Sequence, residues 1–431
     1  MTNVTKLARK NWKPAFSFLL VAFMLFLTAC GSNGASPGSQ TSPQTSPQAS
    51  SQASSQATPQ ASAAANNEPI KIGVLLSFTG SFAPLAESIK NGIDIYFAQH
   101  NGMIGNHKVE LKYEDDEGNP QVALRKYHQL VDSEKVDMLV GPISSAVVYA
   151  LRDQIEKDKI LLIDLNAAAN DISWAKKSNY IYRIAMSNWQ SGSSGAAYFA
   201  TLGKKAFVIA PDYAAGHENA DAFERAYKAA GGTVIQSVFP KLGTNDFATY
   251  LTQITEAKPD IVFAIETGTD GIRLLQQYKQ FGLLGKIPLT SWHEYATELV
   301  TGPAGDAAEG VISAANYIPT LDNPINKKFV ESYVAQYKKN PDEFSVNGFD
   351  SGQVITTAIE KAGSFKTADL INVLKGISYD SPRGQITIDA KTNNPILNMY
   401  IVKNVKKDGK IVQEILETVK DVTMPATDPT K

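Results

Sequence analysis

Residues 70–102 read IKIGVLLSFTGSFAPLAESIKNGIDIYFAQHNG, and this stretch decides the fold of the chain. Its first part, Ile70–Ser77, is a short apolar run with the length and composition of a buried strand. After Pro84, apolar side chains recur four residues apart on one helical face, at Leu85, Ile89, Ile93 and Phe97. A buried strand followed by an amphipathic helix, which ends at Asn101-Gly102, predicts one βα unit of a parallel sheet.

The same unit repeats along the chain in two series. The first has strand candidates at 109–113, 136–140, 160–165 and 180–184, with helix candidates at 121–133 and 146–156. The second has strand candidates at 206–210, 233–239, 260–265 and 287–290, with helix candidates near 192–201, 217–229, 246–257 and 271–281. We therefore predict an α/β fold with two doubly wound lobes.

The last part of the chain has a different pattern. Helix candidates at 325–338, 350–362 and 367–375 precede strand candidates at 385–388, 398–403 and 411–416. Because a lone hairpin is marginal in water, we expect these strands to return to the earlier lobes. The chain would then cross between the lobes several times and form a hinge.

Composition and charge exclude several classes of protein. The 431 residues are 43% hydrophobic and 19% charged, which excludes a wholly disordered chain. The formal net charge is -2, so the basic footprint of a nucleic-acid-binding protein is missing. Cys30 is the single cysteine, which excludes an internal disulfide and a metal site built from cysteines.

Residues 1–29 have the layout of a secretory signal peptide. Four basic residues precede the apolar run Phe16–Leu27, and no acidic residue is present. The run is too short to cross a bilayer core, so we expect it to be removed. The sequence Leu27–Gly31 (LTACG) resembles the lipobox of bacterial lipoproteins, which implies a lipid on Cys30. The alternative is an ordinary signal peptide with an unrelated cysteine.

Residues 30–69 form a predicted lipid-anchored, disordered tether. From Gly31 to Pro69 there is no Val, Ile, Leu, Met or aromatic residue, so this segment cannot form a core. We expect an exported protein held by its lipid on the outer face of the bacterial cytoplasmic membrane. Loss of the four basic residues of the signal leaves 37 Lys and Arg against 43 Asp and Glu, a net charge of -6.

Motifs for catalysis, cofactors and metals are missing from the sequence. It contains no G-x-S-x-G, Walker A or G-x-G-x-x-G stretch, and neither His217-Glu218 nor His293-Glu294 precedes the second histidine of H-E-x-x-H. We therefore expect no enzyme activity, no cofactor and no metal. The acidic cluster Asp115–Gly118 fits either a solvated turn or a cation site.

A candidate ligand site lies in the loop 141–145, which follows a strand and opens a helix. Open α/β sheets bind ligands at the carboxyl ends of their strands. Amides at a helix start, together with a serine hydroxyl, suit a carboxylate, although a plain helix cap is an alternative interpretation. The candidate contacts are Ile143, Ser144 and Ser145, and Tyr213, in another strand-end loop, is a candidate cavity wall.

Several stretches resemble one known family. They are IKIGVLLSFTGSFA at 70–83, LVGPISS at 139–145, APDYAAGHENADAF at 210–223 and NDFATYLTQITEAKPDIVF at 245–263. They resemble the leucine/isoleucine/valine-binding proteins of branched-chain amino-acid ABC transporters, which are type I periplasmic binding proteins. The resemblance runs from about Ile70 to about Val405 with the elements in the same order.

The resemblance implies two lobes joined by a hinge of three crossovers. Lobe 1 would hold 70–186 and 316–397, and lobe 2 would hold 187–315 and 398–423. The crossovers would lie near Ala185–Asn188, Ala314–Tyr317 and Leu397–Met399.

The implied function is capture of a small carboxylate-bearing solute, such as a branched-chain or related amino acid, between the closing lobes. The protein would be a monomer that delivers this solute to an ABC permease in the membrane. One alternative is a ligand-sensing receptor module of the same fold. Another is a binder of a carboxylate other than an amino acid, such as an aromatic or short-chain acid.

The resemblance also implies the ligand contacts. In the first lobe, the ligand carboxylate is held by a serine, here Ser145, and by a threonine whose position Ala169 occupies. Ala167 would contact the ligand through its backbone. In the second lobe, Ala215 stands where an aromatic residue is common, and Thr267 is a further contact. For the acidic residue that binds an ammonium group, either Trp292 occupies the position or Glu294 replaces it.

Overall fold

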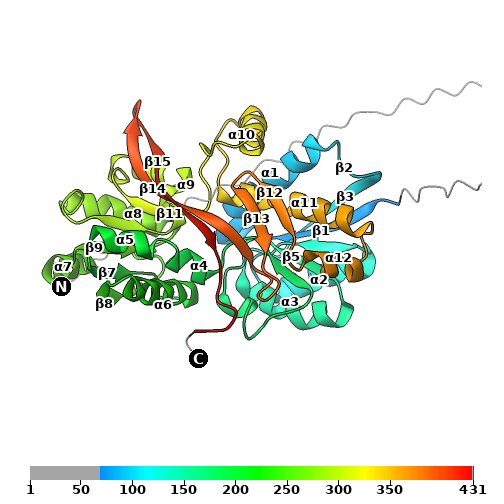
Figure 1. Cartoon of the computed structure of the whole chain (residues 1–431), viewed down its shortest axis with the longest axis horizontal. Helices are drawn as coiled ribbons and strands as arrows, with labels where there is room; N and C mark the ends of the chain where they lie inside the picture. Colours follow the sequence, from blue (N-terminus) through cyan, green and yellow to red (C-terminus); the bar gives the residue numbers. More distant parts are fainter. Residues whose placement is uncertain (1–67, 430) are drawn as a thin grey trace, which may run out of the picture. The chain divides into compact units, whose positions relative to one another are not determined.

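The computed structural model describes residues 68–429 and 431 (Figure 1). The predicted signal peptide 1–29, Cys30 and nearly all of the predicted tether 30–69 lie outside these residues, so they stay predictions. Within the described part of the chain, no helix is both long and apolar enough to span a membrane.

The first sheet has six strands in the order β2-β3-β1-β4-β5-β6. All neighbouring strands run parallel except the short β2, which pairs antiparallel with β3. The central β1 is buried on both faces apart from Lys71, as its continuous apolar sequence predicts. The strands are β1 Ile70–Leu76, β2 Met103–Ile104, β3 His107–Asp115, β4 Met138–Val140, β5 Leu161–Asp164 and β6 Ile181–Arg183.

Helices from two distant parts of the sequence pack together beside this sheet. The helix α11 lies against α1, and the two backbones approach closely at two glycines. A Cβ atom on Gly92 would lie 1.8 Å from the carbonyl oxygen of Ser345, and one on Gly348 would lie 2.0 Å from that of Ile89. The helices are α1 Ala83–Gln99, α2 Pro120–His128, α3 Ser145–Asp158, α10 Pro324–Tyr337, α11 Glu343–Ala362 and α12 Thr367–Leu374, with shorter turns η1 Gly80–Phe82, η2 Gln129–Ser133 and η3 Asn170–Ile172.

The second sheet has nine strands in the order β12-β13-β14-β11-β10-β9-β7-β8, and β15 also pairs with β14. Strands β7 to β11 run parallel, and the later strands extend the sheet in antiparallel pairing. Its strands are β7 Lys205–Ile209, β8 Thr233–Val238, β9 Ile261–Ala264, β10 Leu289–Ser291, β11 Ile312–Ala315, β12 Ser378–Ser381, β13 Gly384–Ile388, β14 Pro395–Lys407 and β15 Lys410–Val422.

A second group of helices accompanies this sheet. They are α4 Asn188–Ser193, α5 Ala196–Leu202, α6 Ala214–Ala229, α7 Ala248–Ala257, α8 Gly268–Gln280 and α9 Glu298–Ala304, with the turns η4 His293–Ala296 and η5 Gly305–Ala307. One continuous buried apolar cluster includes residues of both sheets, such as Ile72 and Phe263. A smaller cluster, which includes Leu139 and Leu151, packs under α2 and α3.

The described chain passes three times between the elements of the two sheets, after β6, after β11 and along β14 (Figure 1). The pairing of β14 with β15 is irregular between Leu397 and Met399, where one of the crossovers is predicted. Near the first passage, the fully buried guanidinium of Arg383 lies 2.8 Å from the Asp350 carboxylate on α11 and donates to the Ile184 carbonyl oxygen at 2.9 Å. This ion pair ties the start of the first passage to α11.

The architecture confirms the predicted α/β fold with two doubly wound lobes. The single helix predicted at 192–201 is wrong, because α4 and α5 are separate helices that meet at Ser194-Gly195. The lobe boundaries stay predictions. Within the segment 316–397 assigned to lobe 1, β12 and β13 join the second sheet by hydrogen bonds through β14.

The acidic cluster Asp115–Gly118 forms a turn at the end of β3. The Asp115 carboxylate accepts hydrogen bonds from the amides of Phe78 and Glu117, both at 2.9 Å. The Asp116 carboxylate accepts one from the Gly118 amide at 2.8 Å. Of the two interpretations of this cluster, these bonds favour the turn, and no group of three or more His, Cys, Asp or Glu in the described residues could hold a metal ion.

Candidate functional site

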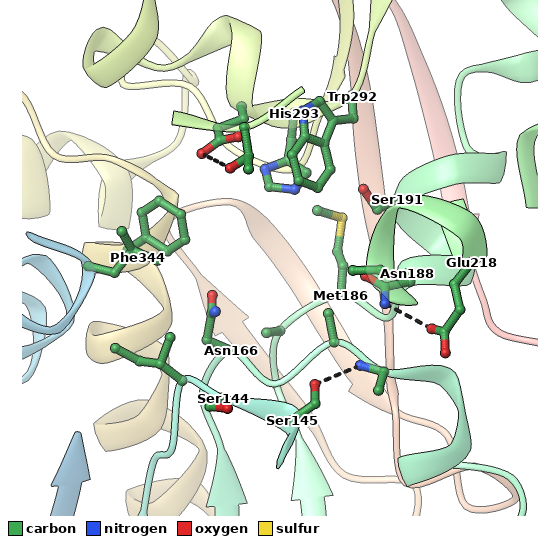
Figure 2. Close-up of a pocket in the computed structure, with 18 of the residues that line it drawn as sticks. Ser144, Ser145, Asn166, Met186, Asn188, Ser191, Glu218, Trp292, His293 and Phe344 are labelled. Atoms are coloured by element: carbon green, nitrogen blue, oxygen red, sulfur yellow. Dashed lines mark hydrogen bonds between the residues drawn. The ribbon is translucent and has the colours of Figure 1, made fainter. Parts of the chain in front are cut away.

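A cavity of about 510 Å³ lies where the loops after the parallel strands of both sheets meet. Loops 143–146 and 166–169, after β4 and β5, form one side, here called the first wall. Thr267 and Trp292–Glu294, after β9 and β10, form the other side, here called the second wall. Figure 2 shows Ser144 and Ser145 on one side of the cavity and Trp292 and His293 on the other.

The first wall places a helix start at the cavity. Ser144 is the N-cap residue of α3, and its side chain makes no capping hydrogen bond. Ser144, Ser145 and Ala146 all line the cavity. The first amides of a helix lack partners within it, and here the Val147 amide already donates to the Ser144 carbonyl oxygen at 3.0 Å. This wall therefore offers the amides of Ser145 and Ala146 and the positive end of the helix dipole. Such a wall is suited to an anion.

The two loops of the first wall are held together by the chain itself. The Ser145 hydroxyl oxygen accepts a hydrogen bond from the Ala169 amide at 3.1 Å (Figure 2). The Asp164 carboxylate accepts bonds from the amides of Asn166 at 3.1 Å and Ala167 at 2.8 Å. These bonds fix the loop after β5 before any solute binds.

Arg183 supports the same loop from beneath. Its buried guanidinium lies 3.5 Å from the buried Asp164 carboxylate and donates to the Ala169 carbonyl oxygen at 2.9 Å. A buried arginine that lies beside a carboxylate and donates to a carbonyl oxygen restricts the geometry of its loop, although Asp164 Oδ2 and Arg183 Nε themselves have no hydrogen-bond partner among the described residues. The first wall is therefore a preorganised surface.

The second wall contains the buried carboxylate of Glu294, which has one bonded oxygen atom and one without a hydrogen-bond partner among the described residues. The Thr267 hydroxyl donates to Glu294 Oε1 at 3.0 Å. Glu294 Oε2 is buried and has no hydrogen-bond partner within the described residues. Burial raises the pKa of the Glu294 carboxyl to about 7. This oxygen can accept a hydrogen bond from a solute that carries a donor or a positive charge.

His293 lies next to Glu294 and bonds across the cavity. Its Nδ1 atom is hydrogen-bonded to Oε1 of Glu343, the first residue of α11. Burial alone would lower the pKa of His293, but the neighbouring Glu343 carboxylate outweighs it and raises that pKa above its ordinary value. The two side chains thus form an ion pair when the imidazole is protonated.

Other lining groups also have buried polar atoms without a partner among the described residues. They are Trp292 Nε1, Ser191 Oγ, Asn316 Oδ1 and Asn347 Oδ1. Buried polar atoms are normally satisfied, so a cluster of open ones around a cavity indicates a place where a polar ligand binds. Both a donor, on Trp292, and acceptors, on the two asparagines, are present.

A second bridge across the cavity lies near the first chain passage. Glu218, on α6, accepts a hydrogen bond from the Asn188 side-chain amide at 2.8 Å (Figure 2) and one from the Asn170 backbone amide at 3.0 Å. Because Asn170 lies just beyond the first wall and α6 accompanies the second sheet, this carboxylate bridges elements of both sheets.

The charges around the cavity are acidic. Glu218, Glu294 and Glu343 line it together with His293, and no Lys or Arg is among the described residues that do so. Apolar surface is supplied by Phe82, Leu85, Met186, Tyr213, Trp292 and Phe344. The cavity therefore combines an apolar interior with a few polar groups, as small-molecule sites do.

Nine of the ten predicted ligand contacts line this cavity. They are Ile143, Ser144, Ser145, Ala169, Tyr213, Ala215, Thr267, Trp292 and Glu294. Ala167 is fully buried and does not line it, because its amide donates to Asp164, while its neighbours Asn166 and Ala168 face the cavity. The predicted lipidation site, Cys30, lies outside the described residues.

Sequence reasoning missed several lining residues. Those with polar side chains are Asn166, Asn188, Ser191, Glu218, His293, Asn316, Glu343 and Asn347. Asn188 and Ser191 belong to α4, whose capping box begins at Ser187, and Glu343 follows the capping residue Asp342 of α11. These helix-start signals are readable in the sequence, but they do not show that the helix starts converge on one cavity.

Comparison with known proteins gives a family match. The chain matches the family described as periplasmic binding protein over residues 69–410. Leu/Ile/Val-binding protein homolog 6 of Brucella melitensis biotype 1 is 30% identical over 355 residues, which cover 80% of this chain and 90% of that protein. The match covers every residue that lines the cavity and all strands of both sheets except β15.

Two solved structures resemble the described fold. A solute-binding protein of an ABC transporter from R. palustris, in complex with benzoate, is 31% identical with a TM-score of 0.71, over 84% of this chain and 98% of that chain. A solute-binding protein of an ABC transporter from Rhodopseudomonas palustris BisB5, in complex with 3,4-dihydroxybenzoic acid, is 27% identical with a TM-score of 0.76, over 83% of this chain and 99% of that chain.

Proposed function

This chain belongs to the periplasmic binding protein family, among the Leu/Ile/Val-binding proteins, and from that premise we propose that it captures a small carboxylate-bearing solute for an ABC importer. The observation that carries the proposal is the start of α3, where Ser144, Ser145 and Ala146 face the cavity. A helix start with free amides favours a carboxylate. The solute undergoes no chemical change in this proposal.

The size of the cavity supports a small solute. Its volume of about 510 Å³ falls within the range of small-molecule sites, which is roughly 300–1,000 Å³. With the carboxylate at the first wall, the rest of the solute would lie among Met186, Tyr213, Trp292 and Phe344. These side chains favour an apolar or aromatic body.

Two solute classes fit this arrangement. A branched-chain or related amino acid is supported by Glu294, whose open Oε2 atom could accept from an ammonium group. An aromatic carboxylate is supported by the ring surface of Trp292 and Phe344 and by the benzoate held in the R. palustris relative. The proposed contacts are Ile143, Ser144, Ser145, Ala169, Tyr213, Ala215, Thr267, Trp292 and Glu294.

Capture would proceed by closure of the two lobes about the chain passages. A solute that touches both walls makes more contacts in the closed state, so binding shifts the population toward closure. The closed protein would then deliver the solute to a permease. The lipid predicted on Cys30, with its tether, would keep the protein at the outer face of the membrane where that permease lies.

A thermal-shift panel tests the proposal. The panel contains the twenty amino acids, benzoate and hydroxylated benzoates, and short-chain carboxylates, each at high concentration. A solute present at 100 times its dissociation constant should stabilise the protein by about 2.7 kcal/mol. A clear response to one amino acid or aromatic acid supports the proposal. No response to any carboxylate, with a response to a neutral solute, contradicts it.

A further inference from the structure

We propose that His293 and Glu343 form a clasp across the solute cavity that holds the cleft closed more firmly at acidic than at alkaline pH. The proposal rests on the proposed function, since it concerns how the same cleft closes. It goes beyond solute contacts because it concerns a bond that the protein makes with itself.

The two members of the clasp come from opposite sides of the cleft. His293 begins η4, directly after β10 of the second sheet, whereas Glu343 begins α11, which packs against α1 beside the first sheet. The bond joins His293 Nδ1 to Glu343 Oε1, and the side chains are only 14% and 4% exposed. Opening the cleft would separate them, so the bond belongs to the closed arrangement.

Glu343 is held rigidly on its side. The preceding Asp342 caps α11 by accepting from the Ser345 amide at 2.9 Å, and the Ser88 hydroxyl of α1 donates to the same carboxylate at 2.5 Å. On the other side, the His293 ring lies 4.6 Å from the Trp292 ring, measured between centroids. Both partners are therefore presented by ordered structure, which lowers the entropic cost of the bond.

The charges that face His293 decide the direction of the pH dependence. Glu343 on α11 and Glu294 on η4 are the carboxylates that act on it. Asp342, which caps α11 just before Glu343, is itself influenced by Lys339 in the loop before that helix. Burial opposes a charged imidazole, yet Glu343 raises the pKa of His293 above the ordinary 6.5. Glu294, with a pKa of about 7, becomes neutral on acidification and leaves Glu343 as the main counter-ion.

The sign of the effect follows from these directions. A raised histidine pKa in the closed state means that the clasp contributes fully below about pH 6.5. Its contribution falls as the pH rises through the raised pKa. The second bridge of the cleft, from Glu218 to Asn188 and Asn170, has amide donors that do not titrate in this range. The clasp should therefore make closure depend on pH through His293, whereas the amide donors of the second bridge should not.

Distance measurement on the ligand-free, full-length protein tests the proposal. In a Cys30→Ser background, spin labels on Ser81→Cys and Leu299→Cys, both exposed and on opposite sides of the cleft, report opening by double electron–electron resonance. We expect the ratio of closed to open molecules to be at least fivefold larger at pH 5.5 than at pH 8.5. In His293→Gln and Glu343→Gln, the ratio should be the same at both pH values.

Two results would overturn the clasp. One is a distance distribution that does not change with pH in the labelled protein that keeps His293 and Glu343. The other is a ratio of closed to open molecules that still depends on pH in both variants. If either variant fails to fold, the pH titration of Trp292 fluorescence replaces it, measured with Trp12, Trp174 and Trp189 replaced by Phe, because a charged imidazole beside the Trp292 indole should quench its emission below the His293 pKa. The measurement needs no solute, so its failure is distinct from failure of the proposed function.

Discussion

The two walls of the cavity differ in where their buried polar atoms without partners lie: behind the first wall, at Asp164 Oδ2 and Arg183 Nε, but at the cavity itself in the second. In the first wall, Ser145 bonds to the Ala169 amide, and Asp164 and Arg183 fix the loop after β5. In the second wall, Trp292 Nε1 and Glu294 Oε2 are buried without partners among the described residues. The difference teaches that the loop of the first wall is held by the chain itself, which agrees with the proposed anchoring of the solute carboxylate there. We propose that solute choice and pH dependence arise at the second wall, where polar atoms without partners face the cavity.

The largest expected effect comes from breaking the support of the first wall. Arg183→Met leaves the buried Asp164 carboxylate unpaired and releases the Ala169 carbonyl oxygen. Loss of one partner of a buried ion pair costs about 3–5 kcal/mol, so the free energy of unfolding in urea should fall by that amount. Arg225→Met, which removes an exposed pair with Asp221, should change it by less than about 1 kcal/mol. Equal effects of the two substitutions would contradict a preorganised first wall.

The next largest effect is expected from the buried carboxylate of Glu294 in the second wall. Burial raises the pKa of Glu294 to about 7, so the folded protein holds this proton more tightly than the unfolded chain. The ionised Glu294 carboxylate therefore destabilises the folded protein. This destabilisation is absent below about pH 4.5, grows as the pH rises to about 7 and is complete above it. Glu294→Gln should remove up to about 3 kcal/mol of this loss between pH 4.5 and pH 8, measured on the ligand-free protein.

A matched control isolates that effect. Glu256→Gln, on an exposed position of α7, should leave the pH dependence of unfolding as it is in the unsubstituted protein. If Glu294→Gln gives the same pH profile as this control, the second wall does not hold a destabilised carboxylate.

The smallest effect concerns the solute contact of the first wall. Ser145→Ala removes the hydroxyl beside the start of α3 and its bond to the Ala169 amide. Affinity for the acid identified in the panel should weaken by about 1–3 kcal/mol, because a hydrogen bond to a charged group is lost. Thr201→Ala, at an exposed site on α5, should leave the affinity unchanged in calorimetry. An unchanged affinity of Ser145→Ala would remove this serine from the contacts.

Most of the fold is predictable from the sequence because its signals are local. Apolar runs such as Ile70–Leu76 and the four-residue spacing that follows them are enough to place β1 and α1. β11, whose sequence is ISAA, was missed because small residues carry little strand signal. The gap between α4 and α5 was missed because residues 190–195, which read QSGSSG, contain no large apolar side chain and therefore carry no helical periodicity.

The site is predictable in part for the same reason. Ser144 and Ser145 sit in a strand-to-helix loop that any doubly wound sheet presents at its ligand edge. Glu343 and Asn347 come from α11, which reaches the cavity through its packing on α1, and no local pattern encodes that approach. The sequence predicts Ala167 as a ligand contact, but its amide donates to Asp164, a buried side chain three residues earlier, and so does not face the cavity.

The central claim is that the start of α3 binds the carboxylate of a small solute. Calorimetric titration with benzoate and benzamide, and with leucine and leucinamide, tests it most directly, since each pair differs at the carboxylate. We predict that at least one acid binds and that its amide binds at least tenfold more weakly, a difference of about 1.4 kcal/mol. An amide that binds as tightly as its acid would contradict the account. If neither acid binds, the pair is replaced by the acid identified in the thermal-shift panel and its amide.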